Sequence, residues 1–194
     1  MISAVVLAAG ASTRMGTHKL LLPFPDEPLL RRVVRQVSLA GFDDVLVVLG
    51  HAHEQTRAVL DGLACRHVVN AEYESGMGSS FRAAVSQLGG SDAAMFALAD
   101  QPFVAAEDYQ RVLDAWRTRG SGIVCVRYGD VTAPPHLFDR AFFPELAALT
   151  HGARPVLECH RDVTTTLQFA PELLADVDTP EDYARAKERL SAGM

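Results

Sequence analysis

The sequence predicts an α/β fold in which a mostly parallel sheet is covered by helices on both faces. Short apolar runs rich in β-branched residues alternate along the chain with segments whose apolar residues recur at helical spacing. The runs are apolar on consecutive residues, which is typical of strands buried on both faces of a parallel sheet. Alternation of strand and helix is typical of right-handed βαβ units, so these two observations together predict the fold class.

Short apolar runs are predicted to form the strands of this sheet. Between them, one group of apolar residues at helical spacing predicts an early helix, and a second group predicts a later one. A closing helix is predicted over residues 180–190. The strand runs are residues 2–7, 45–49, 66–69, 93–99, 122–126 and 164–169, and the helical groups are Leu29, Leu30, Val33, Val34 and Val37, then Tyr109, Val112, Leu113 and Trp116.

Between residues 128 and 166 the alternation becomes irregular. This stretch holds Pro134-Pro135 and a short helical segment near residues 144–149. At 194 residues the chain has the length of one domain and can bury a core without disulfides or metals. We therefore expect a single domain over residues 1–194, in which residues 128–166 form a small insertion or an edge hairpin.

The composition argues against several classes of partner. The formal net charge of −6 and the pI of 5.6 disfavour general binding to nucleic acid or to anionic membranes. The longest apolar runs are far shorter than the roughly 18 residues needed to span a bilayer. Met1 leads directly into an apolar run without a basic leader, so we expect a cytoplasmic protein. Cys65, Cys125 and Cys159 are odd in number and far apart, which predicts neither a disulfide framework nor a zinc site.

The most informative segment directly follows the first predicted strand. Residues 7–19 read Leu-Ala-Ala-Gly-Ala-Ser-Thr-Arg-Met-Gly-Thr-His-Lys. Small residues let the backbone approach a ligand closely, and successive N–H groups can surround an anion. Arg14 and Lys19 add cations that suit phosphate oxygens. The spacing fits neither a Walker loop nor a GxGxxG loop, and on the residues alone a surface loop with two solvated cations is as good an interpretation as a phosphate site.

Three further candidates lie near the predicted ends of strands or starts of helices. Ser80 fits either a helix cap or a contact to a polar ligand group. Asp100 follows the run 93–99 and fits a turn, but ligands of open parallel sheets bind outside the carboxyl ends of strands. The loops after the first, third and fourth strands open onto that edge, so Asp100 is predicted to bind Mg²⁺ there. Asp178, before Thr179, fits the start of a capped helix.

Together these segments resemble the signature of the molybdenum-cofactor nucleotidyltransferases and their close relatives. The pattern Leu-Ala-Ala-Gly-x-Ser-x-Arg-Met-Gly-x-x-Lys of residues 7–19 is long and positionally strict. The resemblance implies a Rossmann-like, three-layer α/β/α nucleotidyltransferase fold in one domain. It continues through three segments that bracket most of the chain: Gly76-Met77-Gly78-Ser79-Ser80, Ala99-Asp100-Gln101-Pro102 and Asp178-Thr179-Pro180-Glu181-Asp182.

The resemblance also assigns roles to individual residues. It implies that Asp100 and Asp178 hold Mg²⁺, and that Arg14, Lys19 and Asp100 carry the catalysis. The residues implied to bind a nucleoside triphosphate are Leu7, Ala8, Ala9, Gly10, Arg14, Lys19, Gly78 and Ser80.

The implied reaction is nucleotidyl transfer, in which a phosphate of the acceptor attacks the α-phosphorus and pyrophosphate leaves. Ala9 stands where the guanylyltransferase branch usually has glycine, so the chain resembles the cytidylyltransferase branch, which makes molybdopterin cytosine dinucleotide from CTP. The implied partners are CTP, a molybdopterin-type or other phosphorylated acceptor, and a molybdoenzyme client, with residues 128–166 as the acceptor's wall. Residues 132–135 and 149–154 depart from the family pattern on that side.

Two alternatives to this function stay open at the level of sequence. One is transfer to another acceptor or from another nucleotide: GTP with molybdopterin, a sugar phosphate or an isoprenoid precursor. The other is a non-catalytic nucleotide-binding or cofactor-chaperone protein.

The histidines give no clear site. His51 and His53 could suggest a metal cluster, but residues two apart on a helix face different directions, so a helix start is the better interpretation. The histidines left without a role are His18, His136, His151 and His160.

Overall fold

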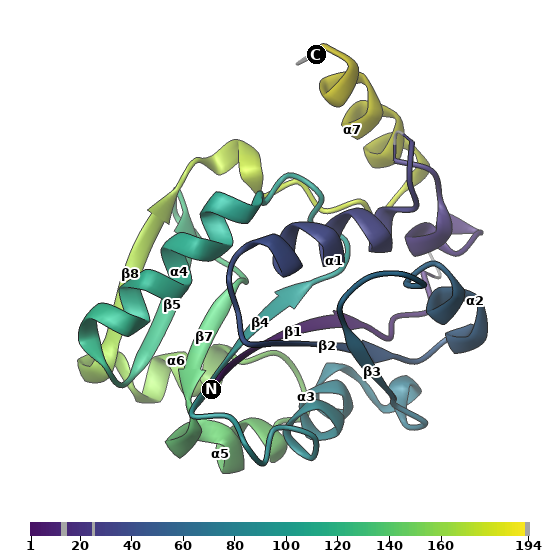
Figure 1. Cartoon of the computed structure of the whole chain (residues 1–194). Helices are drawn as coiled ribbons and strands as arrows, with labels where there is room; N and C mark the ends of the chain where they lie inside the picture. Colours follow the sequence, from purple (N-terminus) through teal and green to yellow (C-terminus); the bar gives the residue numbers. More distant parts are fainter. Residues whose placement is uncertain (13–14, 25, 193–194) are drawn as a thin grey trace.

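The structure of the protein, a computed structural model, describes residues 1–12, 15–24 and 26–192. Within these residues one sheet of eight strands is flanked by helices (Figure 1). The strands are β1 (Ile2–Ala8), β2 (Asp44–Leu49), β3 (Arg66–Val69), β4 (Ala93–Leu98), β5 (Ile123–Tyr128), β6 (Val131–Thr132), β7 (His136–Asp139) and β8 (Thr164–Phe169). The α-helices are α1 (Leu29–Leu39), α2 (His53–Ala58), α3 (Met77–Val85), α4 (Ala106–Arg119), α5 (Phe143–Ala147), α6 (Arg154–Cys159) and α7 (Pro180–Ala192).

The sheet is mostly parallel, with strand order β3-β2-β1-β4-β7-β5-β6 and β8 paired to β5. The strands β3, β2, β1 and β4 run parallel to one another, and β8 runs parallel to β5. The antiparallel strand β7 lies between β4 and β5. Of the two forms expected for residues 128–166, an insertion or an edge hairpin, the edge hairpin is wrong for β7, which is an interior strand. It was missed because it follows β5 and β6 through short turns rather than through a helix, so it breaks the strand–helix alternation.

The side chains of the central strands point alternately to two apolar layers, as a parallel sheet covered on both faces requires. In β1, Ala4 and Val6 pack in the layer with α1 and α4, whereas Val5 and Leu7 pack in the layer with α3 and α5. Figure 1 shows α1, α4 and α7 on one side of the sheet and α3, α5 and α6 on the other. The predicted three-layer α/β/α architecture is confirmed. At the sheet edge, β3 alternates half-buried and exposed residues instead.

The predicted helices form where their apolar residues recur. All the residues predicted to form the buried faces of α1 and α4 are buried. They are Leu29, Leu30, Val33, Val34 and Val37 in α1, and Tyr109, Val112, Leu113 and Trp116 in α4. At the start of α7, Thr179 Oγ1 accepts a hydrogen bond from the Asp182 N–H at 3.2 Å, and Asp182 Oδ2 accepts one from the Thr179 N–H at 2.9 Å. The predicted Thr179 cap is therefore confirmed, with the two residues capping each other. None of the helices in the described part of the chain is long and apolar enough to cross a membrane.

His136 is a core residue of β7. Its Nδ1 accepts a hydrogen bond from the Val126 N–H at 3.4 Å, and its ring meets Phe138 edge-on at 6.4 Å. Burial lowers the pKa of His136 to about 4, so the imidazole is neutral near pH 7. The sequence left the role of His136 open, and the structure shows it as a buried residue of an interior strand.

We expect His136 to make the protein less stable in mild acid. An unfolded histidine titrates near 6.5, so between pH 6.5 and 4 the unfolded chain binds a proton that the folded chain does not. The stabilisation is complete above pH 6.5 and is lost as the pH falls to 4, by about 3 kcal/mol in free energy of unfolding. Urea denaturation across this range should show a smaller loss for His136→Gln than for wild type. Parallel pH curves for the two proteins would contradict the assignment.

Candidate active site

A pocket of about 330 Å³ opens at the carboxyl edge of the sheet, where β1 and β4 end. Register explains the convergence: β1 and β4 are parallel with Leu7 opposite Leu98, and the Ala99 N–H donates to the Leu7 carbonyl at 3.2 Å. The pocket is lined by Leu7, Ala8, Ala9, Gly10, Ser12, Lys19, Leu20, Tyr73, Gly76, Met77, Ser80, Leu98, Ala99, Asp100 and Asp178. Eight of these residues are sites predicted from the sequence: Leu7, Ala8, Ala9, Gly10, Lys19, Ser80, Asp100 and Asp178.

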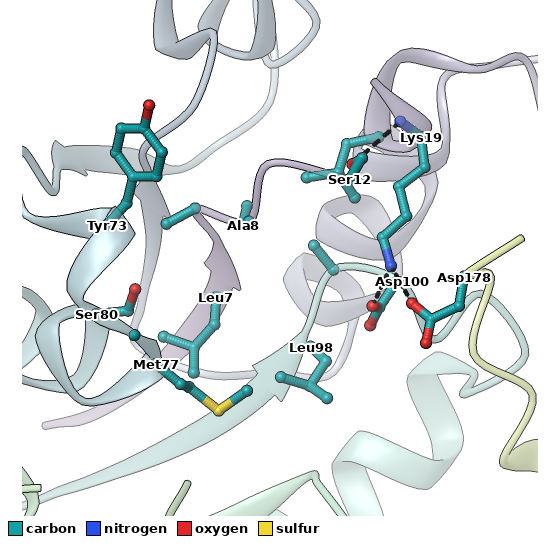
Figure 2. A pocket seen from close by; sticks show the side chains of 15 residues that line it. Leu7, Ala8, Ser12, Lys19, Tyr73, Met77, Ser80, Leu98, Asp100 and Asp178 are labelled. Atoms are coloured by element: carbon teal, nitrogen blue, oxygen red, sulfur yellow. Dashed lines mark hydrogen bonds and ion pairs between the residues drawn. The ribbon is translucent and has the colours of Figure 1, made fainter. Parts of the chain in front are cut away.

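One end of the pocket is charged. Lys19 Nζ lies 2.6 Å from Asp100 Oδ2 and 2.7 Å from Asp178 Oδ1, so a single ammonium bridges two carboxylates from distant parts of the chain (Figure 2). Burial disfavours the charged amine, but the attraction of Asp100 and of Asp178 outweighs it and raises the pKa of Lys19. Lys19 is therefore a fixed cation at neutral pH.

The same carboxylates could hold a divalent cation. Asp100 Oδ1 is buried and has no hydrogen-bond partner among the described residues, which leaves a carboxylate oxygen free to bind a metal ion. The ammonium already lies between the two acids, which shows that a cation fits there. No group of three or more His, Cys, Asp or Glu in the described ranges could hold a metal by itself. A magnesium ion at this pair would therefore take further ligands from phosphate and water, as Mg²⁺ commonly does.

The first loop folds back beside this charged end. The Met15 N–H donates to the Ser12 carbonyl at 3.0 Å, and the Lys19 N–H donates to Ser12 Oγ at 3.3 Å. Ser12 adopts a left-handed backbone with φ of 52°. These contacts return the chain to the pocket so that Lys19, at the start of a short 3-10 helix (Lys19–Leu21), points its side chain inward. The predicted phosphate contact Arg14 lies outside the described residues.

The opposite end of the pocket is uncharged. Figure 2 shows Tyr73, Met77 and Ser80 on this wall, with Leu7, Ala8 and Leu98 between them and the charged end. Such a pocket, apolar and neutral-polar at one end and ionic at the other, matches a molecule with a flat base and a polyphosphate. Tyr73 and Met77 were missed by sequence reasoning, because an aromatic residue and a methionine near a helix start carry no signal of their own.

Two serines at this wall were candidates for a helix cap. The helix α3 begins at Met77 with Gly76 as its cap residue, so Ser79 and Ser80 are its third and fourth residues. Ser79 Oγ donates to the Gly76 carbonyl at 2.7 Å, whereas Ser80 lines the pocket. The capping interpretation is therefore wrong for Ser80.

Gly78 is not among the residues that line the pocket. A Cβ at this position would lie 2.0 Å from the Leu149 carbonyl oxygen, and the Gly78 N–H donates to the Thr150 carbonyl at 3.3 Å. Because Gly78 has no side chain, α3 can pack closely against residues 149–150, which follow α5. This close approach gives Gly78 a structural reason to be glycine, and its contact with the nucleotide stays a prediction.

The remaining histidines lie outside the pocket lining. His18 Nε2 is 3.1 Å from the His51 carbonyl oxygen and its ring stacks on His51 at 5.4 Å, and partial burial lowers its pKa. His18 therefore connects the first loop to the segment after β2 through its contacts with His51. His53 is the first residue of α2, as the helix-start interpretation predicts. His151 is exposed, and His160 pairs with Glu145 at 2.9 Å.

Comparison with known proteins identifies the family. Residues 4–165 match the MobA-like NTP transferase domain. A nicotine blue oxidoreductase of Paenarthrobacter nicotinovorans is 29% identical over 196 residues, which cover 95% of each chain. The bifunctional protein GlmU of Burkholderia multivorans is 33% identical over 130 residues, which cover 66% of this chain and 28% of GlmU. The chain thus spans just over a quarter of that relative's length.

Solved structures agree with this match. Rv0371c from Mycobacterium tuberculosis superposes with a TM-score of 0.85 at 33% identity, covering 96% of this chain and 97% of that one. A nucleotidyl transferase from Methanothermobacter superposes with a TM-score of 0.88 at 25% identity, covering 100% and 99%. Because the domain match spans most of the chain and Rv0371c covers nearly all of it, this protein belongs to the MobA-like NTP transferase family and is a nucleotidyltransferase.

Proposed function

We propose that this nucleotidyltransferase is a CTP:molybdopterin cytidylyltransferase that works with Mg²⁺. A phosphate of molybdopterin would attack the α-phosphorus of CTP in line, forming molybdopterin cytosine dinucleotide and releasing pyrophosphate. The observation that supports CTP is the position of Ala9. The acceptor rests on the sequence resemblance to the cytidylyltransferase branch.

Ala9 follows β1 and lines the pocket at the uncharged end, where its methyl group cannot move aside. A Cβ on Gly50 would lie 2.7 Å from the Ala9 Cβ and 2.8 Å from the Tyr73 Cβ, so these three residues are packed as closely as a glycine allows. The His51 N–H also donates to the Ala9 carbonyl at 3.2 Å and fixes the backbone. A purine needs more space than a pyrimidine, so a fixed methyl here favours CTP over GTP.

The charged end of the pocket supports a metal-dependent transfer. Lys19, Asp100 and Asp178 together carry one net negative charge, which by itself would repel a triphosphate. A divalent cation held by Asp100 and Asp178 would reverse that sign and neutralise charge on the phosphates. A manganese complex of Rv0371c is known, and that protein is similar to this one.

The chain's own residues would position the substrate and compensate charge. The attacking phosphate is ionised near pH 7, so no protein base is needed to activate it. Once a divalent cation takes the two carboxylates, Lys19 would be released from them and would stabilise the departing pyrophosphate, while the small residues Ala8 to Gly10 let the triphosphate approach the backbone. Catalysis would then rest on orientation and electrostatics, both of which are built into the apposed ends of β1 and β4.

Exchange of radiolabelled pyrophosphate into each nucleoside triphosphate, with and without molybdopterin, tests this function. We expect exchange with CTP only when molybdopterin is present. Exchange with GTP, or with a sugar phosphate or isoprenoid precursor as acceptor, would overturn the CTP or the molybdopterin assignment. Binding without exchange under any condition would favour a nucleotide-binding protein. Because one relative is named a nicotine blue oxidoreductase, loss of the colour of nicotine blue should be measured in parallel, and we expect none.

Replacing Ala9 by glycine should shift nucleotide preference towards GTP. One methyl group in a binding pocket is typically worth about tenfold in discrimination, so the ratio of kcat/KM for GTP to that for CTP should rise by about tenfold. Ala4→Gly is the matched control, because it removes a buried methyl from β1, the strand that leads to Ala9, but not from the pocket. It should lower thermal stability and leave the ratio unchanged. An unchanged ratio in Ala9→Gly would remove the support for CTP.

A further inference from the structure

Asn70 lies behind the uncharged wall of the pocket. Its side-chain amide is buried, and the proposed function gives it no role. It follows β3 directly and is 4% exposed. Its Nδ2 donates to Ser79 Oγ at 2.8 Å and to Ser80 Oγ at 3.1 Å. Asn70 thus reaches from the end of a strand to the first turns of α3.

The orientation of this amide is fixed by the backbone. The Glu72 N–H donates to Asn70 Oδ1 at 3.0 Å, and an N–H can only donate. The oxygen of the amide must therefore face Glu72, and the NH₂ group must face the two serines. A flipped amide would place two donors against each other at Glu72.

The fixed amide determines the direction of the Ser80 hydroxyl. A serine hydroxyl has one proton to donate, and Ser80 Oγ uses a lone pair to accept from Asn70. Its neighbour Ser79 accepts from the same amide and donates its proton to the Gly76 carbonyl. Ser80 has no such acceptor among the described residues, and it lines the pocket. Its O–H is therefore available to a ligand as a donor.

The geometry points to Asn70 as a specificity-determining positioning residue, which holds Ser80 as a hydrogen-bond donor towards an acceptor atom of the bound nucleotide. This inference rests on the proposed function for the identity of that acceptor. Cytosine presents two neighbouring acceptors, O2 and N3, on its pairing edge, whereas guanine carries the N–H donors N1 and N2 beside a single acceptor, O6, on its own. A donor held in this direction would therefore favour the pyrimidine independently of the space left by Ala9.

Asn70→Asp tests the direction of the hydroxyl with almost no change of shape. The new carboxylate still accepts from the Glu72 N–H, but it cannot donate to Ser80, which would turn its proton towards the carboxylate. Losing one neutral hydrogen bond to the nucleotide should weaken CTP binding by about tenfold, measured by calorimetry in the presence of Mg²⁺. Circular dichroism and thermal melting establish that the variant is folded.

Ser80→Ala makes the test independent of any change in folding. If Asn70 acts through Ser80, the two single variants should each weaken CTP binding by about tenfold, and Asn70→Asp should cause no further loss in the Ser80→Ala background. The matched control is Ser79→Ala, which removes the other partner of the same amide. It should lower the melting temperature without changing the dissociation constant for CTP.

The outcomes separate this inference from the proposed function. If Asn70→Asp weakens nucleotide binding equally in the wild-type and in the Ser80→Ala background, the role of Asn70 is overturned, whichever nucleotide the protein prefers. Tighter binding of GTP than of CTP by the wild type would overturn the CTP assignment, while non-additivity with the preferred nucleotide would still support Asn70. Repeating the cycle with 2′-deoxy-CTP identifies the acceptor: persistence of the coupling supports a base atom, and its loss would overturn the base assignment in favour of the ribose.

Discussion

Asp100→Asn should reduce nucleotidyl transfer by about 10²- to 10³-fold while the protein stays folded. Asp100 contributes one of the two carboxylates that bind Lys19, and its buried Oδ1 has no hydrogen-bond partner in the described part of the chain. The amide has nearly the same shape but no charge, so it would weaken both the cation site and the placement of Lys19. The kcat of pyrophosphate exchange measures the effect, and the melting temperature establishes the fold.

Asp176→Asn is the matched control for this variant. Asp176 is an exposed acid two residues before Asp178; its Oδ1 accepts from Gln101 Nε2 at 3.1 Å, and it is not among the pocket-lining residues. We expect it to keep activity close to wild type. Near-normal exchange by Asp100→Asn, or an equal loss in both variants, would overturn the assignment of Asp100 to the reacting centre.

Lys19→Met should have opposite effects on catalysis and on metal binding. Turnover should fall by about 10²- to 10³-fold, because the departing pyrophosphate loses its fixed cation. Binding of Mn²⁺ without nucleotide, followed by electron paramagnetic resonance, should become tighter. The reason is that the ammonium, at 2.6 and 2.7 Å from Asp100 and Asp178, competes with a metal for their carboxylate oxygens, and its removal takes that competing cation away.

Lys187→Met provides the control, since Lys187 is exposed on α7 and lies over the ring of Tyr183. It should change neither turnover nor Mn²⁺ affinity. Lys19→Met should also be less stable by about 1–3 kcal/mol, because two partly buried carboxylates lose their counter-ion. Weaker Mn²⁺ binding in Lys19→Met would show that ammonium and metal do not share one position.

The sequence was sufficient where local patterns carry the information. The helical spacing of the residues from Leu29 to Val37 produces α1, and the Thr179 cap starts α7, because both depend on neighbours within a few residues. The phosphate-type loop after β1 and Asp100 after β4 were also predictable. Parallel strands end at one edge, so residues that follow them must converge.

Other features depend on contacts between distant segments. The position of β7 between β4 and β5 follows from pairing that its own short sequence does not encode. Gly78 looked like part of a ligand loop, but its glycine is required by the Leu149 carbonyl more than seventy positions away. Asn70 could not be singled out in the sequence, because an asparagine after a strand is ordinary in a turn. Its role depends on the hydrogen bonds that it donates to Ser79 and Ser80.

By itself, then, the sequence determined the three-layer class and the residues that gather at the end of β1 and β4, because strand period, helix period and the edge rule are local or topological. The tertiary structure decided how those residues are paired. Lys19 lies between Asp100 and Asp178 rather than apart from them, and Ser80 Oγ accepts a hydrogen bond from the Asn70 amide of another segment. Such pairings are set by side-chain distance and by the direction of single protons, which exist only once the strands have brought separate loops together.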